Sequence, residues 1–290
     1  MPQLVHPGYI GIAKIGSAKI RCSGFNVNPV QNILWYDHIV GLRDSTPTTL
    51  GAKGEATSFP NNLQKTFFRP SVKIIQGTMD FPLTENIGDT IFQIASTGEW
   101  FDLEFDYYCE SSRTFVDCKI NSYTLSVRAG DIATVSLNII GIGMSETISV
   151  QTVGNYTDAE KLVTWDTMDI TISNSGQTWD GLSSFDMTIN NNVQPVYTSG
   201  ANQRTGNPVA NDLNPFTLRV GMQHVTGTVT KYNKNYRTRE VDGVPISILV
   251  QYPQAVTIDM LTLFKPMTVD GVVGPIISAY GYEALDKHFY

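Results

Sequence analysis

The sequence is poor in the residues on which most binding and catalytic chemistry depends. Charged residues make up 16% of the 290 positions, below the roughly one quarter of a typical globular protein. There are three cysteines and four histidines. No apolar run approaches the roughly 20 residues that cross a bilayer. These shortages exclude a disulfide-built scaffold and predict a protein without a membrane segment.

The four histidines are scattered and lack the spacing of metal ligands. His6, His38, His224 and His288 have no second histidine, cysteine pair or carboxylate at ligand spacing. The chain also lacks a Gly-x-Ser-x-Gly elbow and the glycine-rich loops that hold phosphate groups. We therefore predict no metal site, no cofactor, no catalytic residues and no enzymatic activity.

The cysteines Cys22, Cys109 and Cys118 are too few, and odd in number, for a disulfide framework. Cys109 and Cys118 flank a predicted turn at 110–113, so a hairpin would bring them near each other. The sequence leaves open whether these two residues pair or stay as buried thiols. The first residues lack the basic and apolar segments of a secretory signal, which predicts folding in a cytoplasm.

Positive charge is also scarce, and the formal net charge is −7. Proteins that grip DNA neutralise its phosphates with clusters of lysine and arginine. The densest basic stretch, residues 231–239, lies between predicted strands and is interpreted as a solvated loop. DNA that meets this protein is therefore expected to pass an acidic surface without specific binding.

What the sequence does contain is the alternating pattern of a β protein. The clearest strand runs over 100–108, where three large apolar residues alternate with three acids that we call the acidic ladder: Asp102, Glu104 and Asp106. A catalytic pair of carboxylates is disfavoured here. Neighbouring positions on one face of an open strand supply no apolar niche to raise one pKa.

One helix is predicted, over 83–96. Thr84 is its expected N-cap, isoleucines recur at spacings of three and four, and Gly98 is expected to end it. A hairpin of two strands, 115–126 and 132–143, is predicted after it. The composition of 37–68, rich in glycine, serine, threonine and proline, predicts a long loop.

The second half of the chain repeats this pattern at low identity. We match Phe25…Pro29 with Phe185…Pro195, 70–77 with 215–221, 107–108 with 251–252, and 116–141 with 256–281, the last with a turn at 269–271. The match predicts a mainly β protein of two tandem β-sandwich or open-barrel domains, with a clear helix only in the first. The predicted boundaries are 1–150 for the first domain, 151–165 for a connector and 166–290 for the second domain, which carries a loop over 197–214.

The stretch 184–230 carries the most specific signal. It holds an alternating strand that begins at Phe185, the turn Asn192-Val193-Gln194-Pro195, a polar loop, a strand at 215–221 and the sequence Val225-Thr226-Gly227. This order resembles that of the tail tube proteins of long-tailed bacteriophages. In that family a phenylalanine-rich strand, an Asn-x-x-Pro-like turn, a flexible loop and a Pro…Gly…Val-Thr-Gly strand pair recur in the same order.

The resemblance implies a structural subunit of a phage tail tube, which assembles with copies of itself into stacked rings around a channel for the genome. Two tube-type folds in one chain imply three chains per ring. Further implied partners are the tape-measure, baseplate and sheath proteins. The implied location is the virion tail, after assembly in the host cytoplasm.

Two features become candidate sites in that setting. The acidic ladder is expected either to line the channel or to lie on the outer surface. The two long loops are expected to reach the adjacent ring, and six residues represent them: Asp37, Thr48, Phe67, Tyr197, Arg204 and Asp212. Strands without internal charge, at 132–143 and 246–252, are expected to pair with neighbouring copies.

Two other functions stay open at this point. A baseplate or tail-hub ring component would have the same fold, and a β-rich module that binds carbohydrates or receptors would have a similar composition. The sequence also leaves open whether the tail is contractile and which face of the sheet meets the channel.

Overall fold

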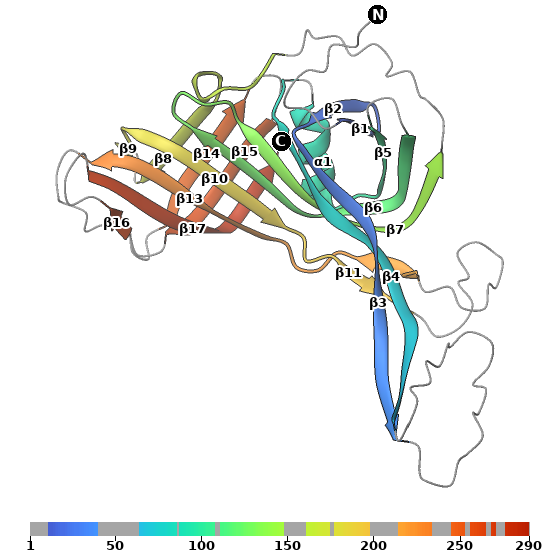
Figure 1. Ribbon diagram of the computed structural model, residues 1–290. Coiled ribbons are helices and arrows are strands. Elements are labelled where there is room, and N and C mark those ends of the chain that lie inside the picture. The colour runs from blue at the N-terminus through green and yellow to red at the C-terminus, as the bar shows by residue number, and fades with distance from the viewer. Residues whose placement is uncertain are drawn as a thin grey trace, which may run out of the picture.

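The computed structural model of the chain is mainly β, as predicted (Figure 1). Its hydrophobic core runs through both halves. The structure describes residues 11–39, 64–85, 87–107, 111–147, 161–174, 177–197, 214–233, 245–252, 256–264, 268–270 and 276–289. Within these ranges the chain forms a single α-helix and a large antiparallel sheet.

The first half contains seven strands and the helix. They are β1 (Gly11–Ile15), β2 (Ala18–Cys22), β3 (Gly24–Ile39), β4 (Gln64–Pro82), α1 (Gly88–Thr97), β5 (Phe101–Tyr107), β6 (Ser111–Arg128) and β7 (Thr134–Thr147). Figure 1 shows β3 and β4 projecting together beyond the body of the molecule.

The second half begins with a short 3-10 helix, η1 (Trp165–Thr167), and continues in strands. They are β8 (Asp169–Asn174), β9 (Gln177–Thr178), β10 (Leu182–Asn190), β11 (Gln194–Val196), β12 (Thr217–Arg219), β13 (His224–Asn233), β14 (Pro245–Tyr252), β15 (Val256–Phe264), β16 (Thr268–Asp270) and β17 (Ile276–Phe289).

The order of the strands is the same in both halves. In the first half, hydrogen-bonded neighbours follow the order β3-β4-β7-β6-β5-β1-β2. In the second half the order is β10-β13-β17-β15-β14-β8-β9. Each strand holds the same place along the chain and in the sheet, so we call the halves repeats. The residue boundaries of the predicted domains stay a prediction.

The strand register extends this correspondence to single residues. Phe25 of β3 and Phe185 of β10 hold the same place in their pairings with β4 and β13. Two residues further along, β3 and β10 each face a glycine, Gly77 and Gly227. A Cβ atom at Gly77 would lie 1.8 Å from a carbonyl oxygen of β3, and one at Gly227 would lie 2.1 Å from a carbonyl oxygen of β10. Both repeats therefore require glycine at the same close approach of two strands.

Several details of the predicted match between the halves are wrong. Pro29 holds the place of Ile189 rather than Pro195, and Gly281 holds the place of Asn138 rather than Gly141. The stretch 70–77 does not correspond to 215–221. Arg69 and Arg219 hold the same place in their hairpins, opposite Leu34 and Gln194, so the residues that follow Arg69 correspond to 220–227. Tyr107 ends β5 as Tyr252 ends β14, one position away from the predicted match. The turn predicted at 269–271 begins inside β16, whose three residues pair with β17. Bulges and loops of different length shift the spacing between repeats, so a constant offset fails.

The helix begins later than predicted and ends where predicted. Thr84 forms an isolated β-bridge with Leu162, so the backbone there is held in an extended pairing and the helix starts only at Gly88, with Ile87 as N-cap. Gly98 takes the left-handed conformation and donates its backbone N–H to the Ile94 carbonyl oxygen at 3.0 Å. Glycine adopts this conformation without steric cost, which explains why the helix stops here.

The loop predicted over 37–68 is shorter than expected. Asp37 lies in β3 opposite Thr66, and Phe67 lies in β4 opposite Tyr36, so both ends of the predicted loop continue the hairpin. Residues 40–63 lie outside the described residues. The content of glycine and proline predicted a loop that is too long at both ends, because strand pairing overrides a weak local preference for turns.

The core of the first repeat lies between two layers. Phe25 of β3 stacks on Phe105 of β5, with ring centroids 3.6 Å apart, and Phe92 of α1 meets Tyr123 of β6 edge to face at 5.7 Å. One face of the strands β3, β4, β7 and β6 is thus covered by β5 and α1. In the second repeat, Phe185 of β10 stacks on Tyr282 of β17 at 6.2 Å.

Candidate assembly interface

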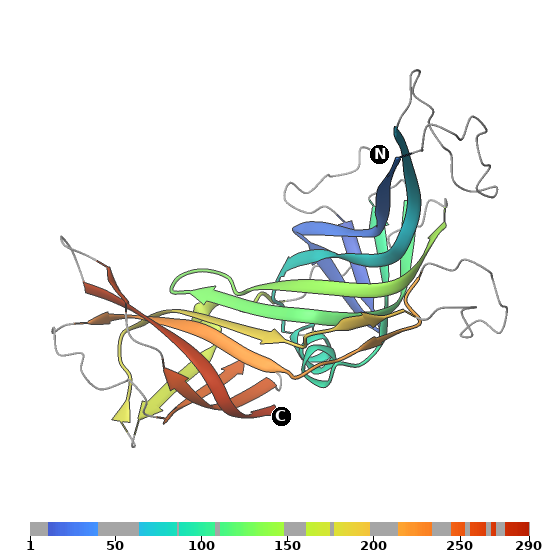
Figure 2. The same cartoon turned by 90° about the horizontal axis from the view of Figure 1, so that it is seen from below.

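The two repeats are joined by a strand pairing that we call the internal seam. The C-terminal part of β6 pairs with β10 in antiparallel register, from Ser122 opposite Asn190 to Arg128 opposite Ser184. The hydroxyl oxygens of Thr124 and Thr188 lie 3.0 Å apart across the seam. Figure 2 shows β6, β10 and β13 running side by side as one band through both repeats. The seam therefore makes one sheet out of two repeats.

Asn191, which follows β10, fixes the seam to the helix of the first repeat. Its side chain is fully buried, and its amide nitrogen donates to the carbonyl oxygens of Ala95 at 2.8 Å and Ile120 at 2.9 Å. The last turn of a helix leaves carbonyl groups without intrahelical partners. A side chain of the second repeat therefore satisfies the end of a helix in the first.

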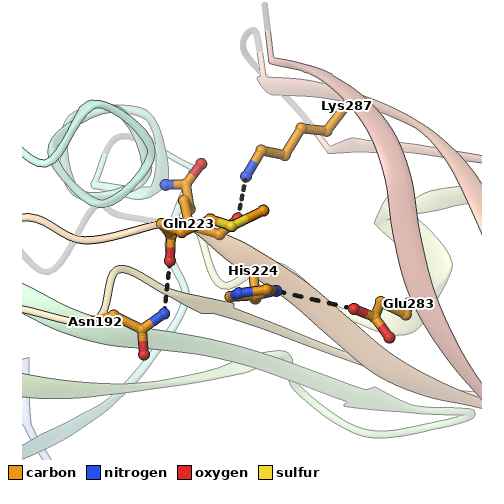
Figure 3. Close-up of polar contacts among 6 residues, drawn as sticks. Asn192, Gln223, His224, Glu283 and Lys287 are labelled. Carbon is orange, nitrogen blue, oxygen red and sulfur yellow. Dashed lines mark hydrogen bonds and ion pairs between the residues drawn. The ribbon is translucent and has the colours of Figure 1, made fainter.

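Gln223, just before β13, completes this network. Its amide nitrogen donates to the Ser96 carbonyl oxygen at 3.0 Å and to the Asn191 side-chain oxygen at 2.7 Å. Its backbone oxygen accepts from the Lys287 ammonium group at 3.4 Å (Figure 3). Burial lowers the pKa of Lys287 from its ordinary value. The network links α1 with β17 and with the residues next to β10 and β13, so it joins the two repeats at this point.

A lysine adds charge complementarity at the same helix end. The Lys119 ammonium group donates to the Gly98 carbonyl oxygen and lies 4.3 Å from the centre of the Trp100 ring. A cation at a helix C-terminus interacts favourably with the helix dipole, and a cation over an aromatic face is also stabilised. Burial is the largest cause of the lowered pKa of Lys119, and the Glu99 carboxylate opposes it.

The seam also has an apolar part, apart from the main core. Ile142 of β7 is only 6% exposed because Val193 and Leu218 of the second repeat, with Ile140 beside them, pack around it. Leu218 belongs to β12, which pairs with β11 in a small separate sheet. Residues from beyond the end of β10 thus cover a side chain of β7.

The face of the band opposite the core is polar. Its residues alternate with the buried ones along each strand and are mostly serine, threonine and asparagine: Asn26, Asn28, Thr78, Ser122, Thr124, Ser126, Ser136, Asn138, Thr188, Thr226, Thr228 and Thr230. Two carboxylates, Asp80 and Asp186, lie among them, and Arg128 lies on the same face opposite Ser184. We call this the polar face, and it continues across the internal seam.

The acidic ladder lies elsewhere, on β5, between β1 and β6. Asp102 accepts a hydrogen bond from the Asp117 backbone N–H at 2.9 Å, and Glu104 forms a 3.0 Å ion pair with Lys14. The pKa of Asp106 is raised, first by partial burial and then by the Glu104 charge, while Lys14 and Lys19 oppose this. Lysines on the paired strands therefore partly neutralise the ladder.

The other predicted site residues are not brought together by the described structure. Asp37 and Phe67 lie in the β3–β4 hairpin, and Tyr197 follows β11, where burial raises the pKa of its phenol. Thr48, Arg204 and Asp212 lie outside the described residues. Sequence reasoning missed Asn191 and Gln223, although the run Asn190-Asn191-Asn192 at the end of a predicted strand was a usable signal.

Two of the cysteines are buried free thiols. They are Cys22 and Cys118, so Cys118 has not formed a disulfide, and Cys109 lies outside the described residues. Burial raises the pKa of Cys22 to about 12 and raises that of Cys118 even further.

Two further observations concern metal sites and membrane spans. Over the part of the chain that the structure describes, no three histidine, cysteine, aspartate or glutamate side chains are grouped so as to hold a metal ion. In the same part of the chain, α1 is too short and too polar to span a membrane.

Comparison with known proteins gives the family. No curated protein matches the chain. The sequence matches the description "Phage tail tube protein" over residues 44–271, which is well over half of its 290 residues. The matched segment includes β4, α1, the internal seam and most strands of the second repeat. The chain therefore belongs to the phage tail tube protein family, whose members have a structural role in the virion tail.

Proposed function

We propose that this chain assembles with copies of itself into rings that stack into a tail tube, and that the genome passes through the channel of the tube. The internal seam is the observation that supports this most directly. In this seam, one repeat extends its sheet into the other by ordinary antiparallel pairing. Repeats that join in this way, edge to different edge, close into a ring when the rotation between them allows it.

The polar face is the proposed wall of the channel. In the first repeat the opposite face of the band is covered by β5 and α1, whereas the polar face continues across the seam. Serine, threonine and asparagine offer uncharged hydrogen-bonding groups, Asp80 and Asp186 add negative charge, and Arg128 adds positive charge at the end of the internal seam. Such a wall would let DNA pass without adhering to it.

On this proposal the acidic ladder lies outside the channel. Its strand, β5, belongs to the layer behind the band, and its carboxylates face lysines of β1 and β2 rather than the polar face. The ladder would then contribute to solubility of the assembled tube, or face a surrounding protein. The loops within 37–68 and 197–214 remain the proposed contacts between stacked rings.

The proposed partners follow from the same arrangement. Other copies of the chain form the ring, three chains giving six repeats, and the tape-measure, baseplate and sheath proteins are candidate neighbours along the tube. The proposed site of assembly is the host cytoplasm. The chain is proposed to act as a structural subunit without catalytic activity.

Negative-stain microscopy of the purified, concentrated protein tests this function. We expect rings or tubes with a central, stain-filled channel. Monodisperse globular particles with affinity for glycans would instead support a carbohydrate-binding module. Hydrolase activity that is abolished by Asp102→Asn or Glu104→Gln would overturn the structural role.

A further inference from the structure

Two strand edges, one at each end of the band, match the two edges that meet in the internal seam. Among the described strands, β3 pairs only with β4, whereas its counterpart β10 pairs with both β13 and β6. In the same set of strands, β16 pairs only with β17. The strand of the first repeat that corresponds to β16 can be identified by following one row of paired residues across each repeat.

One row of residues makes this counterpart explicit. In the first repeat the row crosses β3, β4, β7 and β6 through Gly24, Asp80, Ser136 and Thr124. In the second repeat it crosses β10, β13, β17 and β16 through Ser184, Thr230, Ala279 and Thr268. Thr268 thus holds the place of Thr124, and β16 holds the place of the part of β6 that forms the seam.

We infer that the internal seam is the template for a second seam between chains, in which β3 of one copy pairs with β16 of the next. Thr124 pairs with Thr188, and the place of Thr188 in β10 is held by Asn28 in β3. The register between chains is therefore Asn28 opposite Thr268, with Val27 opposite Val269 and Asn26 opposite Asp270. This inference rests on the proposed ring and specifies how its chains meet.

An exposed leucine supports the same contact independently. Leu285 of β17 lies two positions beyond Glu283, as Ile142 of β7 lies two positions beyond Ile140, and Glu283 lies opposite Thr226 as Ile140 lies opposite Gln76. Leu285 is skipped in the pairing of β17 with β15, where the register shifts between Leu261 and Thr262. Ile142 is 6% exposed, whereas Leu285 is 58% exposed. A large apolar side chain is buried at one seam, and its counterpart lies open where the second seam would form.

The residues that would cover Leu285 are also given by the register. Ile142 is covered by Val193 and Leu218 of the second repeat. The hairpin positions that correspond to these are Ile33 and Phe68, in the projecting part of β3 and β4. The sequence therefore has isoleucine and phenylalanine at the hairpin positions that correspond to Val193 and Leu218.

Pro29 limits the backbone hydrogen bonds that the exposed edge of β3 can form with another strand. It lies within the part of β3 that corresponds to the seam-forming part of β10, at the place of Ile189. Proline supplies no backbone N–H, so it weakens a ladder by one donor and is tolerated at strand edges. We expect the seam between chains to be weaker than the internal seam, and assembly to be reversible at low protein concentration.

Thiol crosslinking tests the register directly. The variant Asn28→Cys/Thr268→Cys, in a Cys109→Ser background, is treated with a short bifunctional maleimide after assembly. We expect a ladder of covalent oligomers on a denaturing gel that stops at the number of chains in one ring. The matched control is Val30→Cys/Asp270→Cys, which lies four residues out of register, roughly 13 Å at 3.3 Å per residue. It should crosslink at least tenfold less.

The outcomes separate this inference from the proposed function. Rings in the microscope with no crosslink, or with equal crosslinking of the control pair, would overturn the register while leaving the tube function in place. A chain that forms no rings under any condition would overturn both.

A second variant tests the apolar contact without relying on engineered thiols. Leu285→Gln should raise the protein concentration needed for ring formation at least tenfold, measured by sedimentation. Ile132→Gln, at a side chain that is 41% exposed and away from the proposed contact, should leave that concentration unchanged. Equal behaviour of the two variants would contradict the burial of Leu285 between chains.

Discussion

Asn191 is the residue on which the junction of the two repeats depends most. It is fully buried and donates to carbonyl oxygens of α1 and β6, while accepting from Gln223. A buried polar group that loses its partner costs more than an ordinary hydrogen bond contributes, since water cannot replace the bond. The network is therefore more vulnerable than its small number of bonds suggests.

We predict that Asn191→Ala lowers the free energy of unfolding by roughly 1–3 kcal/mol, because carbonyl oxygens of Ala95 and Ile120 stay buried without this donor. Thermal unfolding followed by circular dichroism, at equal protein concentration, measures the change. Thr134→Ala is the control, because that hydroxyl makes a 3.4 Å bond at an exposed position. An Asn191→Ala protein as stable as the Thr134→Ala protein would show that the network does not hold the repeats together.

Single residues also show what local sequence can and cannot reveal. Gly98 ended the predicted helix correctly because a left-handed C-terminal position favours glycine in any context. Thr84 failed as the N-cap because its backbone pairs with Leu162, a contact between distant parts of the chain. Asn191 carried no periodic signal, since its partners come from another repeat.

At the scale of elements, strands with strict alternation were predictable and their partners were not. The sequence indicated β5 and the β6–β7 hairpin because apolar and polar residues alternate there with period two. The pairing of β6 with β10 joins residues of different repeats, and no local pattern specifies it. The repeat itself was visible, but its register needed the paired glycines Gly77 and Gly227.

The β3–β4 hairpin is the element for which we predict a role in stacking. Replacement of residues 43–60 by a short glycine-serine linker should leave rings intact but prevent them from stacking into tubes. The described pairings of the band and of the internal seam are made by residues outside this range, whereas the proposed contact with the adjacent ring lies within it. Counting rings and tubes in electron micrographs measures the effect.

The same replacement made in 151–160, within the predicted connector of 151–165, is the control for that experiment and should leave the tubes unaffected. Normal tubes after replacement of 43–60 would remove this loop from the contact between rings. Loss of rings as well as tubes would show that the loop acts within a ring rather than between rings.

At the scale of the whole molecule, the chain consists of two repeats that are joined by the internal seam. Fusion fixes one seam permanently and leaves the matching edges, β3 and β16, at the two ends of the band. Chains with unlike ends add head to tail, and closure into a ring removes both exposed edges. The net charge of −7 opposes association at low ionic strength, so the pairing of edges has to overcome this repulsion.

A cryo-electron microscopy reconstruction of the assembled particle tests this account most directly. We predict a closed ring whose inner wall is one continuous sheet lined by the polar face, with β3 of each chain beside β16 of its neighbour. A channel wall built from other strands, or a protein that stays strictly monomeric when concentrated at moderate salt, would contradict it.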